Sequence, residues 1–188
     1  MSFELRKQKG NKSQEIFERY LKSQSIEFAR QGCEFWDSTD NYLNELKQRM
    51  DRVSYQIRFT PDYSVIKNEI WDIEVKSKFT IEKLAYEMYL ERSKSRNVGL
   101  VVVFRNSIWF SDIRDLVLKP PEQSKWLPIL PVKDDVWLCP RDLSNELLIE
   151  WKAKTGGSGC AFAYISKLKS KFSLLATYDD SNDTFSKG

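Results

Sequence analysis

Histidine is absent from this 188-residue sequence, and cysteine occurs only three times, at Cys33, Cys139 and Cys160. With no histidine and no CxxC pair, a structural zinc site is not expected and a disulfide framework has no support, so we expect reduced thiols. The sequence lacks any run near the ~18 consecutive apolar residues of a membrane-spanning helix, and its start, MSFELRKQKGNKSQ, lacks the apolar segment of a secretory signal. We therefore expect a soluble, cytoplasmic protein with no membrane partner.

Neither sign of charge dominates the composition. Lysine and arginine total 30 against 27 aspartate and glutamate residues, which gives a net charge of +3. This excess is too small to indicate nucleic-acid binding by itself, although it permits local basic faces. A hydrophobic fraction of 41% with 13% aromatic residues is typical of a globular protein, and the length suffices for one domain with a small appendage.

Changes in hydrophobic period along the first half predict the order of the elements. Helical spacing predicts a helix over residues 14–23 and a second from about residue 40 to 53. Alternation with period two follows over residues 55–62 and again over 71–76, and Lys67-Asn68 lies where a tight turn would join them. These two segments predict a β-hairpin.

The next elements indicate an α/β fold. Thr80 is the expected N-cap of a helix that ends at Asn97, and VGLVVVF, residues 98–104, is a short β-branched run typical of a strand covered on both faces. Pro120 and Pro121 interrupt any regular element. We therefore predict a core over residues 1–118, in which residues 1–12 form a flexible basic arm, and a C-terminal α+β extension over residues 119–188.

Three chemically reactive side chains converge in the predicted hairpin. Alternation places Asp62 on the polar face of the first strand, and Glu74 and Lys76 on the polar face of the second. Two carboxylates suit Mg²⁺, which prefers oxygen ligands, and a metal ion with a lysine could stabilise the charge that develops during phosphodiester hydrolysis. The alternative is an ordinary charged sheet face, with the two acids solvated or paired to Lys76.

The same residues resemble the PD-(D/E)xK nuclease superfamily. RFTPDYSV followed by IWDIEVKS is similar to phage junction-resolving endonucleases and to transposon end-cleaving endonucleases of the TnsA type, and NKSQEIFERYL resembles their upstream glutamate helix. The resemblance covers about residues 11–115. It implies a restriction-endonuclease-like core, in which a central mixed β-sheet is flanked by helices.

The resemblance also implies the roles of individual residues. Asp62 and Glu74 would be metal ligands together with the Val75 carbonyl, Lys76 would be the catalytic lysine, and Glu15 would bind a second metal ion or orient water. Glu18 competes with Glu15 for the last role. Asp72 is an ambiguous neighbour, either an accessory acid or an exposed one.

The resemblance therefore implies a Mg²⁺-dependent DNA endonuclease of phage, mobile-element or defence origin, with Mn²⁺ as a substitute. Arg58, Lys78 and Lys83 are candidate DNA contacts, and cutting both strands with one site per chain favours a homodimer. The alternatives are a nuclease-fold module that binds nucleic acid or protein without cutting, and an RNA-directed nuclease. The loop TGGSGC is expected to be a connection, and Trp126, Trp137 and Trp151 are expected to be core residues rather than base-stacking ones.

Overall fold

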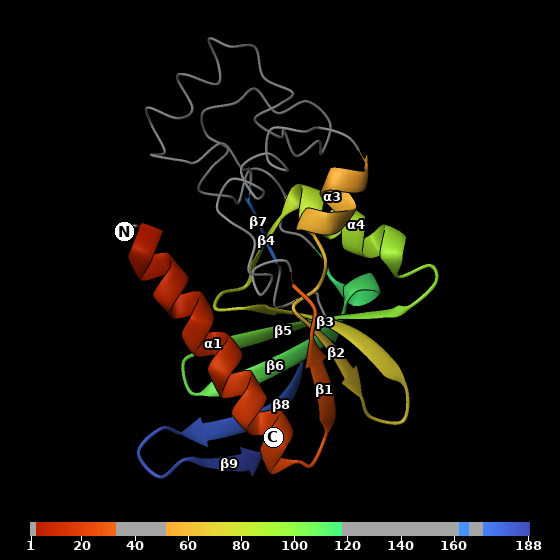
Figure 1. Cartoon of the computed structure of the whole chain (residues 1–188). Coiled ribbons are helices and arrows are strands. Elements are labelled where there is room, and N and C mark those ends of the chain that lie inside the picture. The colour runs from red at the N-terminus through yellow and green to blue at the C-terminus, as the bar shows by residue number, and fades with distance from the viewer. Residues whose placement is uncertain (1–2, 33–51, 118–161, 166–170) are drawn as a thin grey trace.

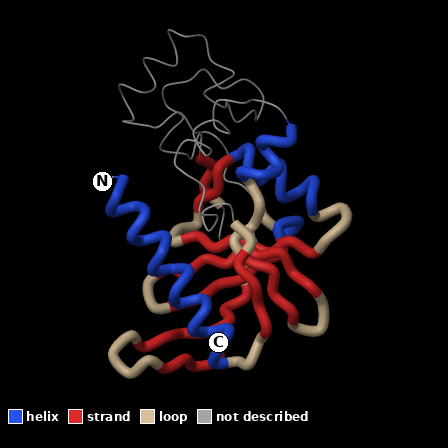
Figure 2. The backbone as a smooth tube through the Cα atoms, in the orientation of Figure 1, coloured by secondary structure: helices blue, strands red, loops and turns tan. Residues whose placement is uncertain are grey.

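The computed structural model describes residues 3–32, 52–117, 162–165 and 171–188 (Figure 1). Within these ranges a mixed seven-stranded sheet has the order β1-β2-β3-β5-β6-β8-β9, and β4 pairs with β7 in a small second sheet. The strands are β1 Glu27–Arg30, β2 Tyr63–Ile66, β3 Ile70–Lys76, β4 Thr80–Glu82, β5 Asn97–Phe104, β6 Ser107–Asp112, β7 Phe162–Tyr164, β8 Ser173–Asp179 and β9 Thr184–Lys187. The helices are α1 Phe3–Ser23, α3 Arg52–Arg58, α4 Lys83–Arg92 and the 3-10 helix η2 Ile113–Asp115. The α/β class and the central mixed sheet flanked by helices are as predicted (Figure 2).

Strand β5 lies in the middle of the sheet, parallel to β3 and antiparallel to β6. Its residues from Val98 to Val103 are all buried, as expected for a β-branched run covered on both faces. Val101 and Val103 face the core under α1, whereas Val98, Leu100 and Val102 face the core under α4 and η2. The alternation along β5 thus divides the protein into two layers of core, one on each side of the sheet.

Helix α1 confirms the helix predicted over residues 14–23 and extends it toward the N-terminus. A stripe of four residues packs on the sheet: Ile16, Phe17, Tyr20 and Leu21. The helix begins at Phe3, so residues 3–12, predicted as a basic arm, belong to α1. Its exposed Lys12 and half-buried Arg19 bind Asp180 in the β8–β9 loop, at 2.7 and 3.3 Å.

The prediction of a strand over residues 55–62 is wrong. Residues 52–58 form α3, and the first hairpin strand, β2, begins only at Tyr63. A short alternating segment fits both periods, and the restriction that Pro61 places on Thr60 turns the chain from helical to extended at this point. The hairpin itself is confirmed, because β2 and β3 pair antiparallel across a turn in which Asn68 has a φ of 54°.

The prediction that Thr80 caps a helix is also wrong. Thr80–Glu82 form β4, which pairs with β7, and α4 begins at Lys83 with Glu82 as its N-cap residue. The distant segment 162–164 supplies backbone hydrogen-bond partners that no local pattern indicates. Ile81, Ala85 and Tyr89 follow one another at four-residue steps, and all three are buried.

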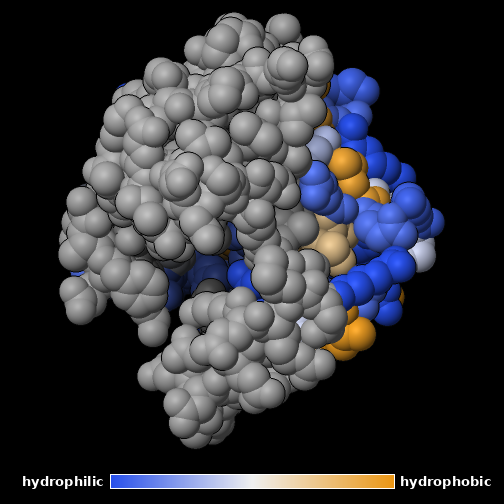
Figure 3. Space-filling view, turned by 90° about the horizontal axis from the view of Figure 1, so that it is seen from above, coloured by the Kyte–Doolittle hydropathy of each residue, from blue (hydrophilic) through white to orange (hydrophobic). Residues whose placement is uncertain are grey.

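The last two strands extend the same sheet, since β8 pairs with β6 and β9 with β8. The tryptophans at 126, 137 and 151 and the TGGSGC loop lie outside the described residues. The side of the described surface that carries α3 and α4 is mainly hydrophilic (Figure 3). Within the described ranges, no helix is long and apolar enough to span a membrane.

Candidate functional site

Asp62 lies where the β2–β3 ladder ends. The two strands pair only as far as Tyr63 and Ile73, so beyond this point no strand in the described part of the chain pairs with β3 on the β2 side. The Asp62 carboxylate takes that place, because its Oδ2 accepts a hydrogen bond from the backbone N–H of Val75 at 2.7 Å. The N–H and C=O of one strand residue point to the same edge, so the Val75 carbonyl faces the side on which Asp62 lies.

Glu74 and Lys76 share one face of β3, as the alternation predicts. Their side chains contact each other directly through Glu74 Oε1 and Lys76 Nζ. Burial disfavours the charged form of Lys76, but attraction to Glu74 and Asp62 outweighs burial and raises the pKa of the ammonium. Lys76 is therefore a cation at neutral pH, held between two acids.

This face is not the polar surface that the sequence predicts. Glu74 and Lys76 lie beside Leu100 and Val102 of β5, which belong to the core under α4. Asp62 and Glu74 are only 9% and 6% exposed, whereas a third of the Lys76 side chain reaches solvent. Helix α4 covers the sheet here, so the acids lie in a partly closed site whose solvent contact is mainly through the lysine.

Tyr89 of α4 is the residue that sequence analysis missed on this side of the site. Burial raises the pKa of its phenol, and Glu74, which is hydrogen-bonded to it, raises that pKa further. Tyr89 thus keeps its proton and donates a hydrogen bond to the Glu74 carboxylate. Its four-residue spacing from Ala85 and Ile81 is a signal that could have indicated a buried position, but no local signal indicates its polar partner.

Helix α1 brings Gln14 to Asp62, not Glu15. Gln14 Nε2 donates to Asp62 Oδ1 at 3.1 Å, and one turn later Glu18 accepts a hydrogen bond from the Tyr63 hydroxyl at 2.8 Å and pairs with Arg30. Glu15 is exposed, and no hydrogen bond or ion pair of its side chain is found among the described residues. Helical geometry explains the difference, because Gln14 and Glu18 share a face that Glu15 does not.

Asp72 lies on the same face of β3 but belongs to another cluster. It is 1% exposed and binds Arg92 at 2.7 Å, with Arg96 at 3.7 Å. Both arginines lie at or beyond the end of α4, away from Lys76. Asp72 is therefore neither an exposed acid nor a partner of Glu74; it anchors the end of α4 to β3.

The structure places two of the three candidate DNA contacts. Arg58 is the last residue of α3, with its guanidinium 5.2 Å from the centre of the Phe59 ring, and Lys78 is exposed directly after β3. Lys83 begins α4, but its side chain lies outside the described residues. Lys78 and Lys83 follow Lys76 in the sequence by two and seven residues.

The donor set around Asp62 fits a hard cation in its chemistry. Two carboxylates and the Val75 carbonyl are oxygen ligands of the kind that Mg²⁺ takes, with water and substrate oxygens completing its shell. Among the described residues, no group of three or more acidic, histidine or cysteine side chains forms a metal site, so Glu15 does not complete one. The fit is that of a two-carboxylate site.

No protein-family model matches the chain, and no curated protein matches it.

Proposed function

We propose that this protein is a Mg²⁺-dependent DNA endonuclease of the PD-(D/E)xK type. The observation that carries the proposal is the Asp62 to Val75 hydrogen bond, which joins the PD segment to the ExK segment beside the contact of Glu74 with Lys76. The superfamily resemblance supplies the reaction, hydrolysis of a phosphodiester bond. The α/β class with its mixed central sheet supports the further proposal of a restriction-endonuclease-like fold.

The proposed metal ligands are Asp62, Glu74 and the Val75 carbonyl. A bound Mg²⁺ would supply charge neutralisation at the phosphate and a more acidic water. Gln14 donates to Asp62 and Tyr89 to Glu74, so each carboxylate is held in orientation by a neutral donor. Glu15 has in this proposal only the second-metal or water-orienting role that the resemblance implies.

The proposed task of Lys76 is electrostatic. Its raised pKa means that it stays protonated at neutral pH, so it is a cation that stabilises the attacking oxygen or the transition-state phosphate, and not a base. Its partial exposure allows a DNA strand to reach it. Arg58, Lys78 and Lys83 are the proposed contacts to the strand.

A second candidate is a module of the same fold that binds without cutting. The low exposure of Asp62 and Glu74, with Lys76 already paired to Glu74, favours it, because a satisfied buried ion pair is also a common structural arrangement. A third alternative, an RNA-directed nuclease, is tested in the same experiment by adding RNA of matched sequence as a substrate.

One cleavage experiment separates these functions. The protein is incubated with Mg²⁺ or Mn²⁺ and a panel of plasmid, linear, single-stranded and four-way DNA, together with matched RNA. Cutting of DNA that chelator stops and Glu74→Gln abolishes supports the proposal, with Lys94→Ala as a control on an exposed lysine at the end of α4. Binding of DNA without cutting in any arm would select the non-catalytic module.

A further inference from the structure

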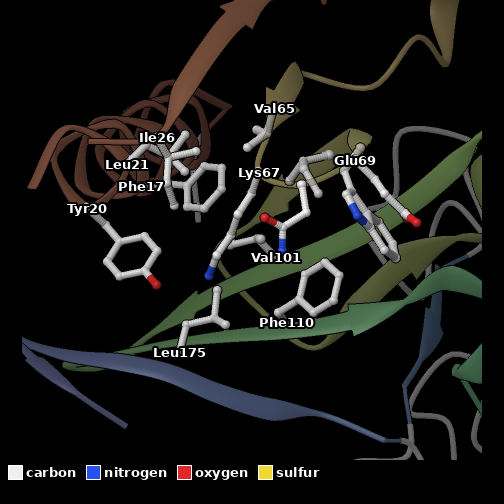
Figure 4. Close-up of a pocket in the computed structure, with 13 residues that line it drawn as sticks. Phe17, Tyr20, Leu21, Ile26, Val65, Lys67, Glu69, Val101, Phe110 and Leu175 are labelled. Carbon is white, nitrogen blue, oxygen red and sulfur yellow. The ribbon is translucent and has the colours of Figure 1, made fainter. Parts of the chain in front are cut away.

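A second candidate site lies on the α1 side of the sheet, opposite the face of β3 that carries Glu74 and Lys76. A cavity of about 380 Å³ opens between α1, the β2–β3 turn and the sheet, within the ~300–1,000 Å³ range of small-molecule sites (Figure 4). Its walls come from α1, β2, β3, β5, β6 and β8 and are almost entirely aliphatic or aromatic. It is separate from the proposed nuclease site, so a ligand can occupy it whether or not the protein cuts DNA.

Gly99 of β5 explains how one wall of the cavity is formed. A Cβ at this position would meet the Phe110 ring at 2.4 Å and Ile73 at 2.8 Å, so only glycine lets these side chains lie across the strand. Phe110 in turn packs edge-on against Trp71, with ring centroids 5.3 Å apart. The result is an aromatic wall of two nearly perpendicular rings opposite the apolar stripe of α1.

Two hydrogen-bond donors point into this apolar space. Tyr20 is only 8% exposed, its hydroxyl is directed into the cavity in Figure 4, and no hydrogen bond of that hydroxyl is found in the described part of the chain. Lys67 is exposed in the β2–β3 turn, its side chain extends over the cavity, and its ammonium has no ion pair among the described residues. The nearby Glu69 carboxylate accepts a hydrogen bond from Asn97 at 2.9 Å and forms no ion pair with Lys67 within the described ranges.

We infer that this cavity binds a small apolar carboxylic acid, with the hydrocarbon body against the aromatic wall and the carboxylate between Lys67 and Tyr20. A carboxylate is acceptor-only, which matches two donors. An ammonium ligand would be repelled by Lys67, which is exposed at the mouth of the cavity, and a neutral ligand would gain no charge-assisted hydrogen bond from Lys67 or Tyr20. Charge complementarity therefore selects an acid over a cation or a plain hydrocarbon.

The test compares probes that share one body and differ in the head group. Binding of decanoate, decanol and decylammonium to the full-length protein is measured by calorimetry, with 2-naphthoate as an acid with an aromatic body. The expected result is one-to-one binding of one or both acids, at least about tenfold tighter than the neutral or cationic probe. Equal affinity for decylammonium, or no binding of either acid because another segment or a second copy fills the cavity, would overturn the inference.

Variants locate the binding within the cavity. Lys67→Met and Tyr20→Phe should each weaken acid binding by about five- to tenfold, because each removes one donor to a charged acceptor. Lys94→Met, an exposed lysine on the other side of the sheet, should leave the affinity unchanged. Leu175→Trp, which fills the cavity from partly exposed β8, should abolish binding while circular dichroism stays unchanged. Normal acid binding by both Lys67→Met and Leu175→Trp would overturn the assignment.

Discussion

Glu74 and Lys76 are neighbours on one face of β3, yet the proposed reaction gives them different tasks. Glu74→Gln removes a metal ligand, so Mg²⁺ binding measured by calorimetry and DNA cutting should both be lost. Lys76→Met leaves the carboxylates in place, so DNA and metal binding should persist while the cleavage rate falls by about 10²–10³, the usual cost of one electrostatic group.

Exposed Lys94→Ala is the matched control for loss of a positive charge. Should Lys76→Met cut at the normal rate with Mg²⁺, the role of the lysine is wrong, and with it the PD-(D/E)xK proposal for this chain. Should Glu74→Gln bind Mg²⁺ as the parent protein does, the ligand set is wrong.

Asp72 is the residue whose removal should cost stability rather than activity. Asp72→Asn leaves Arg92 without its charged partner at a buried position, and because Arg92 is itself 30% exposed we expect a loss of about 2 kcal/mol in the free energy of unfolding, below the full cost of a buried pair. Urea unfolding measures it.

Two comparisons make the Asp72 prediction specific. Asp183→Asn, which breaks an exposed pair with Arg19, should cost less than about 1 kcal/mol. The double variant Asp72→Asn/Arg92→Leu should lose less than the sum of its single changes, because neither charge is then left alone. A loss at Asp72 equal to that at Asp183 would contradict the anchoring role.

At the scale of elements, α4 holds both acids of β3. Tyr89 binds Glu74, and three residues later Arg92 binds Asp72. Two side chains on the same face of α4 therefore contact two acids on the same face of β3. The two acids are two residues apart on β3, and their partners Tyr89 and Arg92 are three residues apart, nearly one turn, on α4. The position of α4 therefore determines how open the proposed site is.

Helix α1 supplies the test of which neighbouring side chain supports Asp62. Gln14→Ala removes the donor to Asp62 and should lower the cleavage rate roughly tenfold, the worth of a hydrogen bond to a charged group. Glu15→Ala changes an exposed side chain and should have a smaller effect. A Glu15→Ala protein that no longer cuts, beside an active Gln14→Ala protein, would restore the helix acid of the superfamily pattern.

At the scale of the molecule, the seven-stranded sheet contains strands from both halves of the chain, from β1 at one edge to β9 at the other. Ending the chain at residue 170 would remove β8 and β9, expose the edge of β6 and uncover Ile108, which is fully buried. An unpaired edge over an open core favours aggregation. We expect this shortened protein to lose its cooperative urea transition, and a fully folded, monodisperse product would show that residues up to 170 are self-sufficient.

Assembly is the second property of the whole molecule that the proposal implies. Each chain has one proposed site, and cutting both strands of a duplex calls for two sites related by a two-fold axis. Light scattering should give twice the mass of one chain for the protein bound to duplex DNA. A monomer both free and on DNA would contradict the homodimer.

Several features were predictable from local sequence because they depend on neighbours along the chain. The β-branched run 98–104, the apolar stripe of α1 and the turn at Lys67-Asn68 each have a strong local cause. The same holds for the alternation that places Glu74 and Lys76 on one face. Alternation along a strand is set by backbone geometry, so it needs no knowledge of the rest of the fold.

Other features were decided by tertiary structure alone. Thr80–Glu82 became a strand because the distant segment Phe162–Tyr164 pairs with it and outweighs a weak local preference. Which side chains meet Asp62 and Glu74 depended on how α1 and α4 lie on the sheet, which brought Gln14 and Tyr89 to the acids and left Glu15 in solvent. The sequence by itself determined which reactive groups share a strand face; the packing of helices determined their burial, their hydrogen-bond partners and the protonation of Lys76, because solvation and charge in a site depend on every element around it.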